Sequence, residues 1–246
     1  MNGYILVDKP KDWTSFDVVA RVRGLVRAAH RQMMATQSDN LDGKPAAQHQ
    51  QLPKRVKVGH TGTLDPQATG LLVILVGNYT KRATELTKLD KTYEVVMKLG
   101  ETSTTGDVEG EKVPVSDQQP SSEELQVVLD AFVGDIMQTP PIYSAIKVDG
   151  VRAYKLAREG KEVKLEARPA RIDSLQLTEF DYPYVHFTVD VSSGTYIRSL
   201  VEDIGSRLET GAYMSDLRRT RVGQFKIEDA TEINALRSED LPIRQL

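Results

Sequence analysis

The sequence predicts an α+β fold built on a mixed, mostly antiparallel sheet that is flanked by helices and loops. Short apolar runs and runs of alternating polarity indicate strands, and segments with a helical period separate them. Single helices interrupt series of strands, an order that argues against a regular βαβ array. The 246 residues, of which 39% are hydrophobic and 27% charged, suffice for a substantial core. We expect a single domain over residues 1–246.

The first part of the chain predicts a strand, a helix and a loop. The strand spans Gly3–Asp8 and ends before Pro10, because proline cannot continue a hydrogen-bonded ladder. Ser15 has the residue type of a helix N-cap. Residues 31–55 are polar and lack periodicity, so we expect a mobile loop there. The apolar face of the helix that follows Ser15 comprises Val18, Val19, Val22, Leu25, Val26 and Ala29.

In the rest of the chain, segments with the apolar period of a helix alternate with segments that have the period of a strand. Leu71–Val76 is an apolar, β-branched run typical of a buried strand, and Lys91–Leu99 alternates in the manner of a strand with one face inward. Ser121–Phe132 is predicted to be a helix capped by Ser121 or Ser122, with glutamates in its first turn. Further helices are expected at Thr80–Leu89, 195–208 and 229–236, and further strands at 161–168, 171–180 and 184–192.

Composition excludes several classes of chemistry. Cysteine is absent, so the chain has no disulfide, thiolate metal site or cysteine nucleophile. The N-terminus carries Asp8 and Lys9 where a signal peptide would be apolar, and no run of 18 apolar residues occurs, so we expect a cytoplasmic protein. The net charge of −3 argues mildly against nucleic acid, but arginines cluster at 218–221 and could form a local basic face.

No metal, nucleotide or serine-nucleophile motif is present. The four histidines are scattered without metal-ligand spacing, so we expect no metal. The patterns GxGxxG, GxxxxGK[ST] and GxSxG do not occur. Carboxylate chemistry or pure binding remains.

Residues 59–66, with the sequence GHTGTLDP, form the strongest candidate for a functional loop. Two glycines, an imidazole and an Asp-Pro pair directly precede a predicted buried strand, an arrangement suited to presenting side chains from a rigid support. Asp65 could equally form only an Asx turn, with Gly62 supplying a positive φ. On these residues alone both interpretations stand.

Four longer segments resemble, in order and spacing, the TruB family of tRNA pseudouridine-55 synthases. They are GHTGTLDPQATGLL, KTYEVVMKLGETSTTGDVEG, PPIYSAIKVDGVRAYKLAREG and SSGTYIRSLVEDIG. The resemblance implies the pseudouridine synthase fold and the isomerisation of uridine 55 in the T-loop of tRNA by base flipping and aspartate catalysis. It also implies that no cofactor is needed, and that the partner is the T-arm stem-loop of tRNA bound by a monomer without an obligate protein partner.

The resemblance also assigns catalytic roles. Asp65 matches the family's catalytic aspartate, which acts as the nucleophile. Arg198 matches an arginine that pairs with this aspartate and keeps it ionised. Tyr93 matches a tyrosine that stacks on the flipped uracil. Attack of Asp65 on C1′, attack on C6 and a glycal route all remain open.

Substrate binding is assigned by the same resemblance. His60 matches a histidine that fills the space left by the flipped base, and Tyr196 and Leu217 match residues that line the uracil pocket. Residues 140–160, within a longer insertion near 138–165, resemble a segment that clamps the T-arm. The residues expected to reach phosphates are Lys9, Lys81, Lys147, Arg152, Arg218 and Arg219.

Two departures from the family pattern qualify this picture. Asp12 occupies a position where relatives usually carry glycine, but aspartate tolerates left-handed backbone better than most residues. Relatives usually continue into a C-terminal, PUA-like RNA-binding domain, for which we expect no room in this chain. The alternatives to a stand-alone synthase are the catalytic subunit of a guide-RNA-dependent pseudouridylation complex and a non-catalytic tRNA-folding chaperone.

Overall fold

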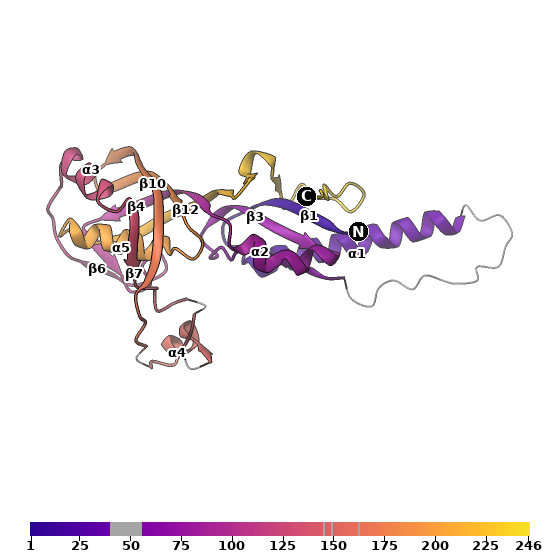
Figure 1. Ribbon diagram of the computed structural model, residues 1–246, viewed down its shortest axis with the longest axis horizontal. Helices are drawn as coiled ribbons and strands as arrows, with labels where there is room; N and C mark the ends of the chain where they lie inside the picture. The colour runs from indigo at the N-terminus through magenta and orange to yellow at the C-terminus, as the bar shows by residue number, and fades with distance from the viewer. Residues whose placement is uncertain (40–55, 145, 149, 162) are drawn as a thin grey trace. The chain divides into compact units, whose positions relative to one another are not determined.

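The computed structural model describes residues 1–246 except 40–55, 145, 149 and 162 (Figure 1). Contacts divide the chain into two compact units. Unit 1 comprises Met1–Lys88 and Thr220–Leu246, and unit 2 comprises Leu89–Arg219. The sequence was expected to form a single domain. Because the contacts give two units, each unit is described separately.

Unit 1 is built on a small mixed sheet. Strand β1 (Gly3–Lys9) pairs antiparallel with β3 (Thr69–Val76) over its whole length, from Gly3 opposite Val76 to Lys9 opposite Gly70. Strand β2 (Val58–His60) also pairs antiparallel with β3, whereas β14 (Thr231–Glu232) pairs parallel with β1. The predicted strands at Gly3–Asp8 and Leu71–Val76 are therefore confirmed.

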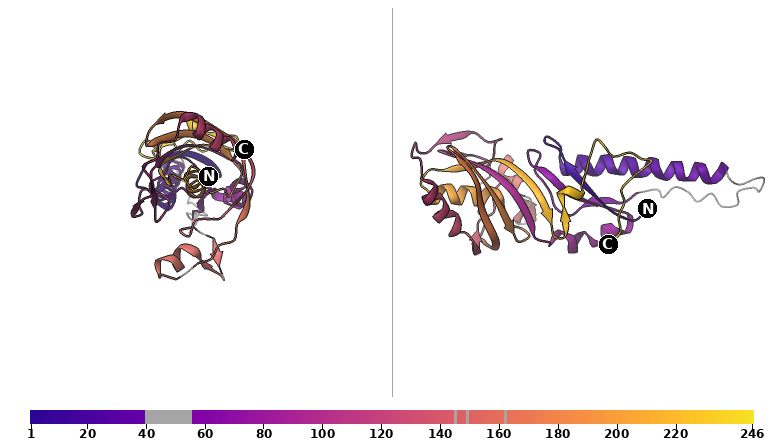
Figure 2. Two further views of the ribbon diagram at one scale, coloured as in Figure 1. Left: turned by 90° about the vertical axis from the view of Figure 1, so that its left-hand side faces the viewer. Right: turned by 90° about the horizontal axis from the view of Figure 1, so that it is seen from above.

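The long helix α1 (Ser15–Asp39) lies along this sheet in both Figure 1 and Figure 2. Its predicted apolar face is confirmed, since Val18, Val22 and Val26 are buried in one cluster with residues of β1 and β3. The predicted loop start at Arg31 is wrong, because the helix continues to Asp39. Arginine, glutamine, methionine and alanine in this stretch favour helix by their intrinsic propensity. Residues 40–55 of that predicted loop lie outside the described residues.

Two predicted helices of unit 1 are corrected. In place of one helix at Thr80–Leu89, the chain forms a 3₁₀ helix η1 (Gly77–Arg82) and a short α2 (Ala83–Thr87). In place of a helix at 229–236, it forms η2 (Ile227–Asp229) and β14. Pairing of Thr231 and Glu232 with β1 outweighs the local helical pattern there. Strand β13 (Phe225–Lys226) pairs antiparallel with the end of β12 (Ala212–Val222), whose last residues belong to unit 1.

In unit 2 the sheet strands follow the order β12, β4, β11, β10, β7. Strands β4 (Lys91–Leu99), β11 (Tyr184–Val191), β10 (Arg168–Asp181) and β7 (Gly134–Gln138) pair antiparallel in that order. The predicted strands at 91–99, 171–180 and 184–192 are confirmed, and so is the mostly antiparallel α+β class. Strands β7 and β12 were not predicted.

The two longer helices of unit 2 pack on each other. Helix α3 (Ser122–Asp130) begins with a capping box between Ser121 and Glu124, as the sequence predicts. Helix α5 (Ile197–Arg207) lies within the predicted range 195–208 and buries Leu200, Val201 and Ile204. Its first turn carries Arg198.

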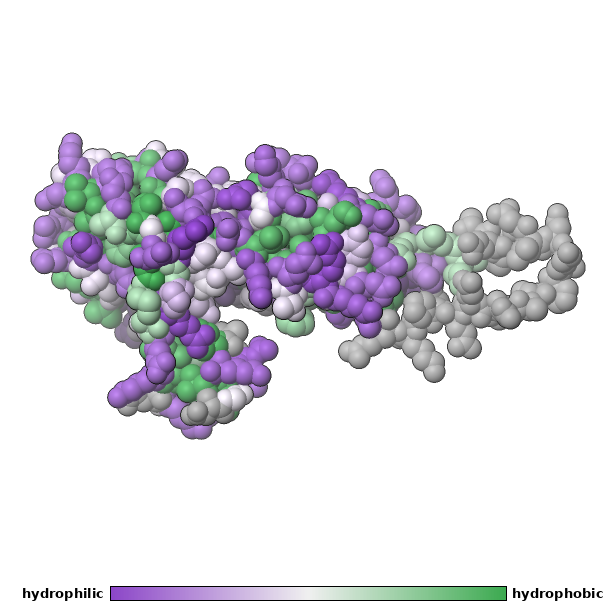
Figure 3. Space-filling view, in the orientation of Figure 1, coloured by the Kyte–Doolittle hydropathy of each residue, from purple (hydrophilic) through white to green (hydrophobic). Residues whose placement is uncertain are grey.

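The remaining elements of unit 2 are short. Strands β5 (Glu101–Ser103) and β6 (Lys112–Pro114) form a hairpin. Strands β8 (Lys147–Val148) and β9 (Val151–Arg152) and helix α4 (Ala153–Arg158) lie in the insertion that follows β7. The insertion shows apolar patches among hydrophilic side chains in Figure 3. The predicted strand at 161–168 is wrong, because β10 begins only at Arg168.

In the part of the chain that the structure describes, every helix is too short or too polar to cross a membrane.

Candidate functional site

The loop that carries Asp65 is anchored in the unit 1 sheet at both ends. His60 is the last residue of β2, and β3 begins at Thr69. The N–H of Thr61 donates to the carbonyl of Val73, 3.2 Å away, and the N–H of Ala68 donates to the carbonyl of Asp65 at 3.1 Å. Proline at position 66 suits the second position of that turn. The carboxylate of Asp65 is therefore presented, half-buried, from a short and firmly held connection.

Lys9 ties this loop to the end of β1. Its side chain is 0% exposed, and its Nζ donates to the carbonyls of Pro10 at 2.8 Å, Trp13 at 2.6 Å and Pro66 at 3.2 Å. A phosphate contact, as predicted for Lys9, would require these bonds to open. The structure gives Lys9 a structural role instead, because three carbonyl oxygens stabilise a buried ammonium.

Ser15 holds the residue that precedes Asp65. The predicted N-cap of α1 is wrong: Thr14 and Asp17 form the cap, with the N–H of Asp17 donating to Thr14 Oγ1 at 3.1 Å and the N–H of Thr14 donating to Asp17 Oδ2 at 2.9 Å. The buried Ser15 hydroxyl is free of that task. Its Oγ donates to the carbonyl of Leu64 at 3.0 Å and accepts from the N–H of Leu64 at 2.9 Å.

Asp12 takes the backbone conformation for which glycine is usual. Its φ is 65°, in the left-handed region that aspartate tolerates. Its N–H donates to the carbonyl of Pro66 at 2.9 Å, and its Oδ1 accepts from Gln67 Nε2 at 3.2 Å. The turn thus contributes two more contacts to the Asp65 loop.

His60 and Phe16 form an aromatic pair beside this loop. Their ring centroids lie 5.8 Å apart with the planes at 90°. Nδ1 of His60 accepts from the N–H of Gly62 at 3.3 Å, which fixes the imidazole, and Phe16 is 73% exposed. Lys81 is exposed on η1. These side chains present an aromatic and a basic group on unit 1.

Arg198 in unit 2 is buried and bonded to two loops. Its Nη1 donates to the carbonyl of Thr105 at 3.1 Å, and its Nη2 donates to the carbonyl of Tyr143 at 3.0 Å. Oδ2 of Asp107 lies 3.6 Å from Nη1, and both side chains are about one-tenth exposed. Asp107 is itself held by the N–H of Glu109, which donates to its Oδ1 at 3.0 Å. The guanidinium plane is therefore fixed from several directions.

Two acidic residues on the same helix have raised pKa values. Burial raises the pKa of the Glu202 carboxyl, and the nearby Arg198 guanidinium opposes that rise. Burial also raises the pKa of Asp203. Arg198 therefore lies near two carboxyl groups, those of Asp107 and Glu202.

Residue Tyr196 is the N-cap of α5 and is bonded to Gln138 at the end of β7. Gln138 Nε2 donates to the carbonyl of Tyr196 at 3.0 Å, and the N–H of Tyr196 donates to Gln138 Oε1 at 2.8 Å. Tyr93 is buried on β4 opposite Val189 of β11, and Leu217 is buried on β12.

The basic residues of unit 2 differ in exposure. Arg219 is 1% exposed, which does not fit the predicted contact with a phosphate at the surface. Burial, with a contribution from Arg219, lowers the pKa of Lys91 to about 8. Arg218 is half-buried, whereas Lys147 and Arg152 are exposed in the insertion.

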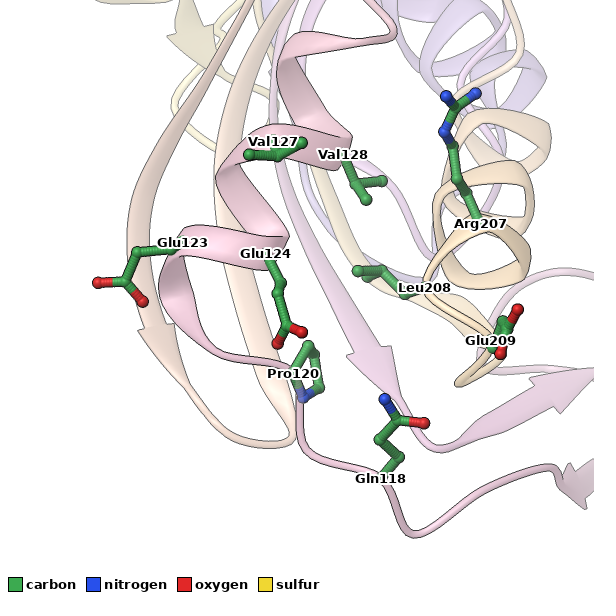
Figure 4. Close-up of a pocket in the computed structure, with 9 residues that line it drawn as sticks. All are labelled: Gln118, Pro120, Glu123, Glu124, Val127, Val128, Arg207, Leu208 and Glu209. Atoms are coloured by element: carbon green, nitrogen blue, oxygen red, sulfur yellow. The ribbon is translucent and has the colours of Figure 1, made fainter.

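A groove of about 450 Å³ lies between α3 and the turn after α5, lined by Val127, Val128 and Leu208 with glutamates at its rim (Figure 4). None of the predicted site residues lines it. Within the described residues, no group of three histidine or carboxylate side chains is placed to hold a metal ion.

The predicted site residues belong to both units. Unit 1 holds Lys9, His60, Asp65 and Lys81, and unit 2 holds the others. Sequence reasoning missed Ser15 as a support of the loop, and it missed Gln138 and Asp107. Asp107 lies inside one of the recognised segments, but nothing in the spacing marks it as a partner of Arg198.

Comparison with known proteins gives the family. Residues 50–197 match the model of the TruB family pseudouridylate synthase (N terminal domain), and residues 198–242 match the tRNA pseudouridylate synthase B C-terminal domain. A relative from Opitutus terrae named tRNA pseudouridine synthase B is 40% identical, covering 98% of this chain and 90% of its own length. A relative of the same name from Clostridium novyi is 40% identical, covering 98% of this chain and 74% of its own length.

A solved structure described as a Cbf5-Nop10-Gar1 complex superposes with a TM-score of 0.66 at 29% identity, covering 95% of this chain. This chain spans about half of that one, 53%. The family match over most of the sequence and the 40% identity to relatives of similar length agree with the antiparallel fold and the anchored Asp65 loop. The chain belongs to the TruB family of pseudouridylate synthases.

Proposed function

We propose that this protein is a tRNA pseudouridine synthase that converts uridine 55 of the T-loop into pseudouridine. The observation that carries the proposal is the Asp65 loop, anchored in the sheet and supported by Lys9, Asp12 and Ser15 in a chain of this family. The relatives named tRNA pseudouridine synthase B support tRNA as the substrate. A tRNA substrate also fits the cytoplasmic location predicted from the sequence.

The reaction needs no change of oxidation state. The C1′–N1 bond breaks, the uracil turns within the site and C1′ joins C5; the C5 proton is then released and N1 takes up a proton, so that the product is an isomer of the substrate. The Asp65 carboxylate acts directly on the substrate, as a nucleophile in two of the possible routes and as a base in the third. Attack on C1′, attack on C6 and formation of a glycal are three routes that use the same carboxylate.

Arg198 and Tyr93 support this step. A guanidinium that pairs with a carboxylate fixes its orientation, and the bonds from Arg198 to Thr105 and Tyr143 hold the guanidinium plane itself. Tyr93 stacks on the flipped uracil, and Tyr196 and Leu217 line the uracil pocket. His60 replaces the flipped base in the T-loop, which offsets part of the cost of unstacking.

Phosphate contacts come from lysine and arginine side chains that are accessible to solvent. Lys81, Lys147 and Arg152 are exposed, and Arg218 is half-buried. We therefore retain these four as RNA contacts and assign Lys9 and Arg219 to structural roles. The insertion after Gln138 clamps the T-arm, and the protein acts as a monomer without an obligate protein partner.

Tritium release tests this function. The purified protein is incubated with a tRNA transcript labelled at C5 of uridine, without guide RNA or other protein, and compared on a transcript with cytidine at position 55. Release from the first and none from the second is expected. Binding without release would favour a chaperone. Release only after guide RNA and partner proteins are added would favour the guide-dependent subunit, which the likeness to the Cbf5 complex makes the second candidate.

A further inference from the structure

Gln138 pairs with both backbone groups of one residue. It is the last residue of β7 and is 3% exposed. Its amide donates to the carbonyl of Tyr196 at 3.0 Å and accepts from the N–H of Tyr196 at 2.8 Å. Tyr196 has no side-chain cap, and its carbonyl also accepts the first helical bond of α5 from the N–H of Leu200 at 3.1 Å. The Gln138 amide thus fixes the backbone at the point where α5 begins.

The chain after Gln138 contacts the same helical turn twice more. The hydroxyl of Ser199 donates to the carbonyl of Thr139 at 2.8 Å. Nη2 of Arg198 donates to the carbonyl of Tyr143 at 3.0 Å. Residues 196, 198 and 199 are therefore tied to residues 138–143, with Arg198 between the two outer ties.

We propose that Gln138 is a positioning residue for pseudouridine formation. Through its bonds to the Tyr196 backbone, it determines the position of the Arg198 guanidinium. The inference rests on the proposed function. An uncharged amide of this length both donates and accepts in this geometry at every pH. Asparagine is shorter by one methylene, ionised glutamate cannot donate, and leucine does neither.

The consequence should appear in the chemical step. A small displacement of a catalytic group can reduce a rate about a hundredfold without changing the groups themselves. Phosphate contacts made elsewhere would continue to bind tRNA. Loss of the Gln138 pair should therefore lower the rate of the bound complex far more than its affinity.

The test uses three variants of the full chain under single-turnover conditions. Gln138→Leu removes both bonds, and Gln138→Glu keeps the acceptor but donates only when protonated. Gln126→Leu is the matched control, because that amide bonds the Asp130 side chain on α3 at 2.8 Å. We expect Gln138→Leu to lose about a hundredfold in rate with less than a threefold change in tRNA Kd. Gln126→Leu should match the native protein.

The pH profile of Gln138→Glu separates positioning from mere support of the fold. Burial beside a carbonyl raises a carboxyl pKa, so the protonated form, which can donate to Tyr196, gains as pH falls. The rate of this variant relative to the native protein should rise from pH 8 to pH 6, and this measurement stands even if Gln138→Leu does not fold. Unchanged rates in Gln138→Glu at every pH, or losses that follow Kd alone, would overturn the inference. Continued activity of Asp65→Asn would instead overturn the proposed function.

Discussion

The Asp65 loop of unit 1 and the start of α5 in unit 2 are both held by hydrogen bonds, but these come from different numbers of chain segments. The loop is hydrogen-bonded to Lys9, Asp12 and Ser15, which belong to a single stretch of seven residues between β1 and α1. The start of α5 is hydrogen-bonded to Thr105 and, in a second segment, to Gln138, Thr139 and Tyr143. Asp65 therefore depends on one stretch of chain, whereas Arg198 depends on two, one around Thr105 and one at the start of the insertion.

The contrast predicts a large effect on Arg198 when charge is kept but shape is changed. In Arg198→Lys, a single ammonium cannot reach the Thr105 and Tyr143 carbonyls together. We expect the single-turnover rate to fall about a thousandfold, worth about 4 kcal/mol of transition-state stabilisation. Rapid-quench measurement of pseudouridine checks this. A rate within tenfold of the native value would show that the two loop carbonyls do not position Arg198.

The Asp65 loop offers a test with neighbouring hydroxyls. Ser15→Ala leaves the buried N–H and carbonyl of Leu64 without their hydroxyl partner, so we expect a loss of about 2 kcal/mol in the free energy of unfolding. The rate should also fall about tenfold through displacement of Asp65. Urea denaturation and single-turnover assays measure the two effects.

Thr14→Ala is the matched control for Ser15→Ala. It removes only the cap of α1 and should cost about 1 kcal/mol without lowering the rate. Equal rate losses in the two variants would mean that the start of α1, and not the Ser15 contact, matters to Asp65.

Lys91 gives a smaller effect that depends on pH. Its pKa in the folded protein is about 8, below the ordinary 10.5, because burial and Arg219 disfavour its charge. Between these values the unfolded chain binds more protons than the folded one, so the free energy of unfolding rises with pH. We expect a gain on the order of 2 kcal/mol from pH 8 to 10.5. Denaturant titrations should show this gain in the native protein and lose it in Lys91→Met, and identical slopes would contradict it.

Much of the fold was predictable because the periodicity of apolar residues and the capping residues lie within each element's own segment of sequence. The alternation in Lys91–Leu99, the apolar run of β3 and the capping box of α3 each suffice to identify an element. The extension of α1 to Asp39 was missed because its far end has helix-forming residues without an apolar face. The predicted helix at 229–236 failed because strand pairing with β1 decides the structure there.

The candidate site was predictable only where a residue type and its loop coincide, as at Asp65. Lys9 and Arg219 were expected at the surface because basic residues usually lie there, and only the packing shows their burial. Ser15 looked like a cap because Thr14 and Ser15 are both capping residue types. Gln138 carries no sequence signal, since its importance comes from a contact with a residue 58 positions away.

The central claim is that the Asp65 carboxylate performs the chemical step. It is tested most directly by Asp65→Asn, which keeps the size of the side chain and removes its charge. Pseudouridine at position 55 is measured by rapid quench, and tRNA Kd by filter binding on the same protein. We expect no product over many native half-times and a Kd within about threefold of the native value, because phosphate contacts dominate affinity. Multiple turnover by Asp65→Asn would contradict the claim.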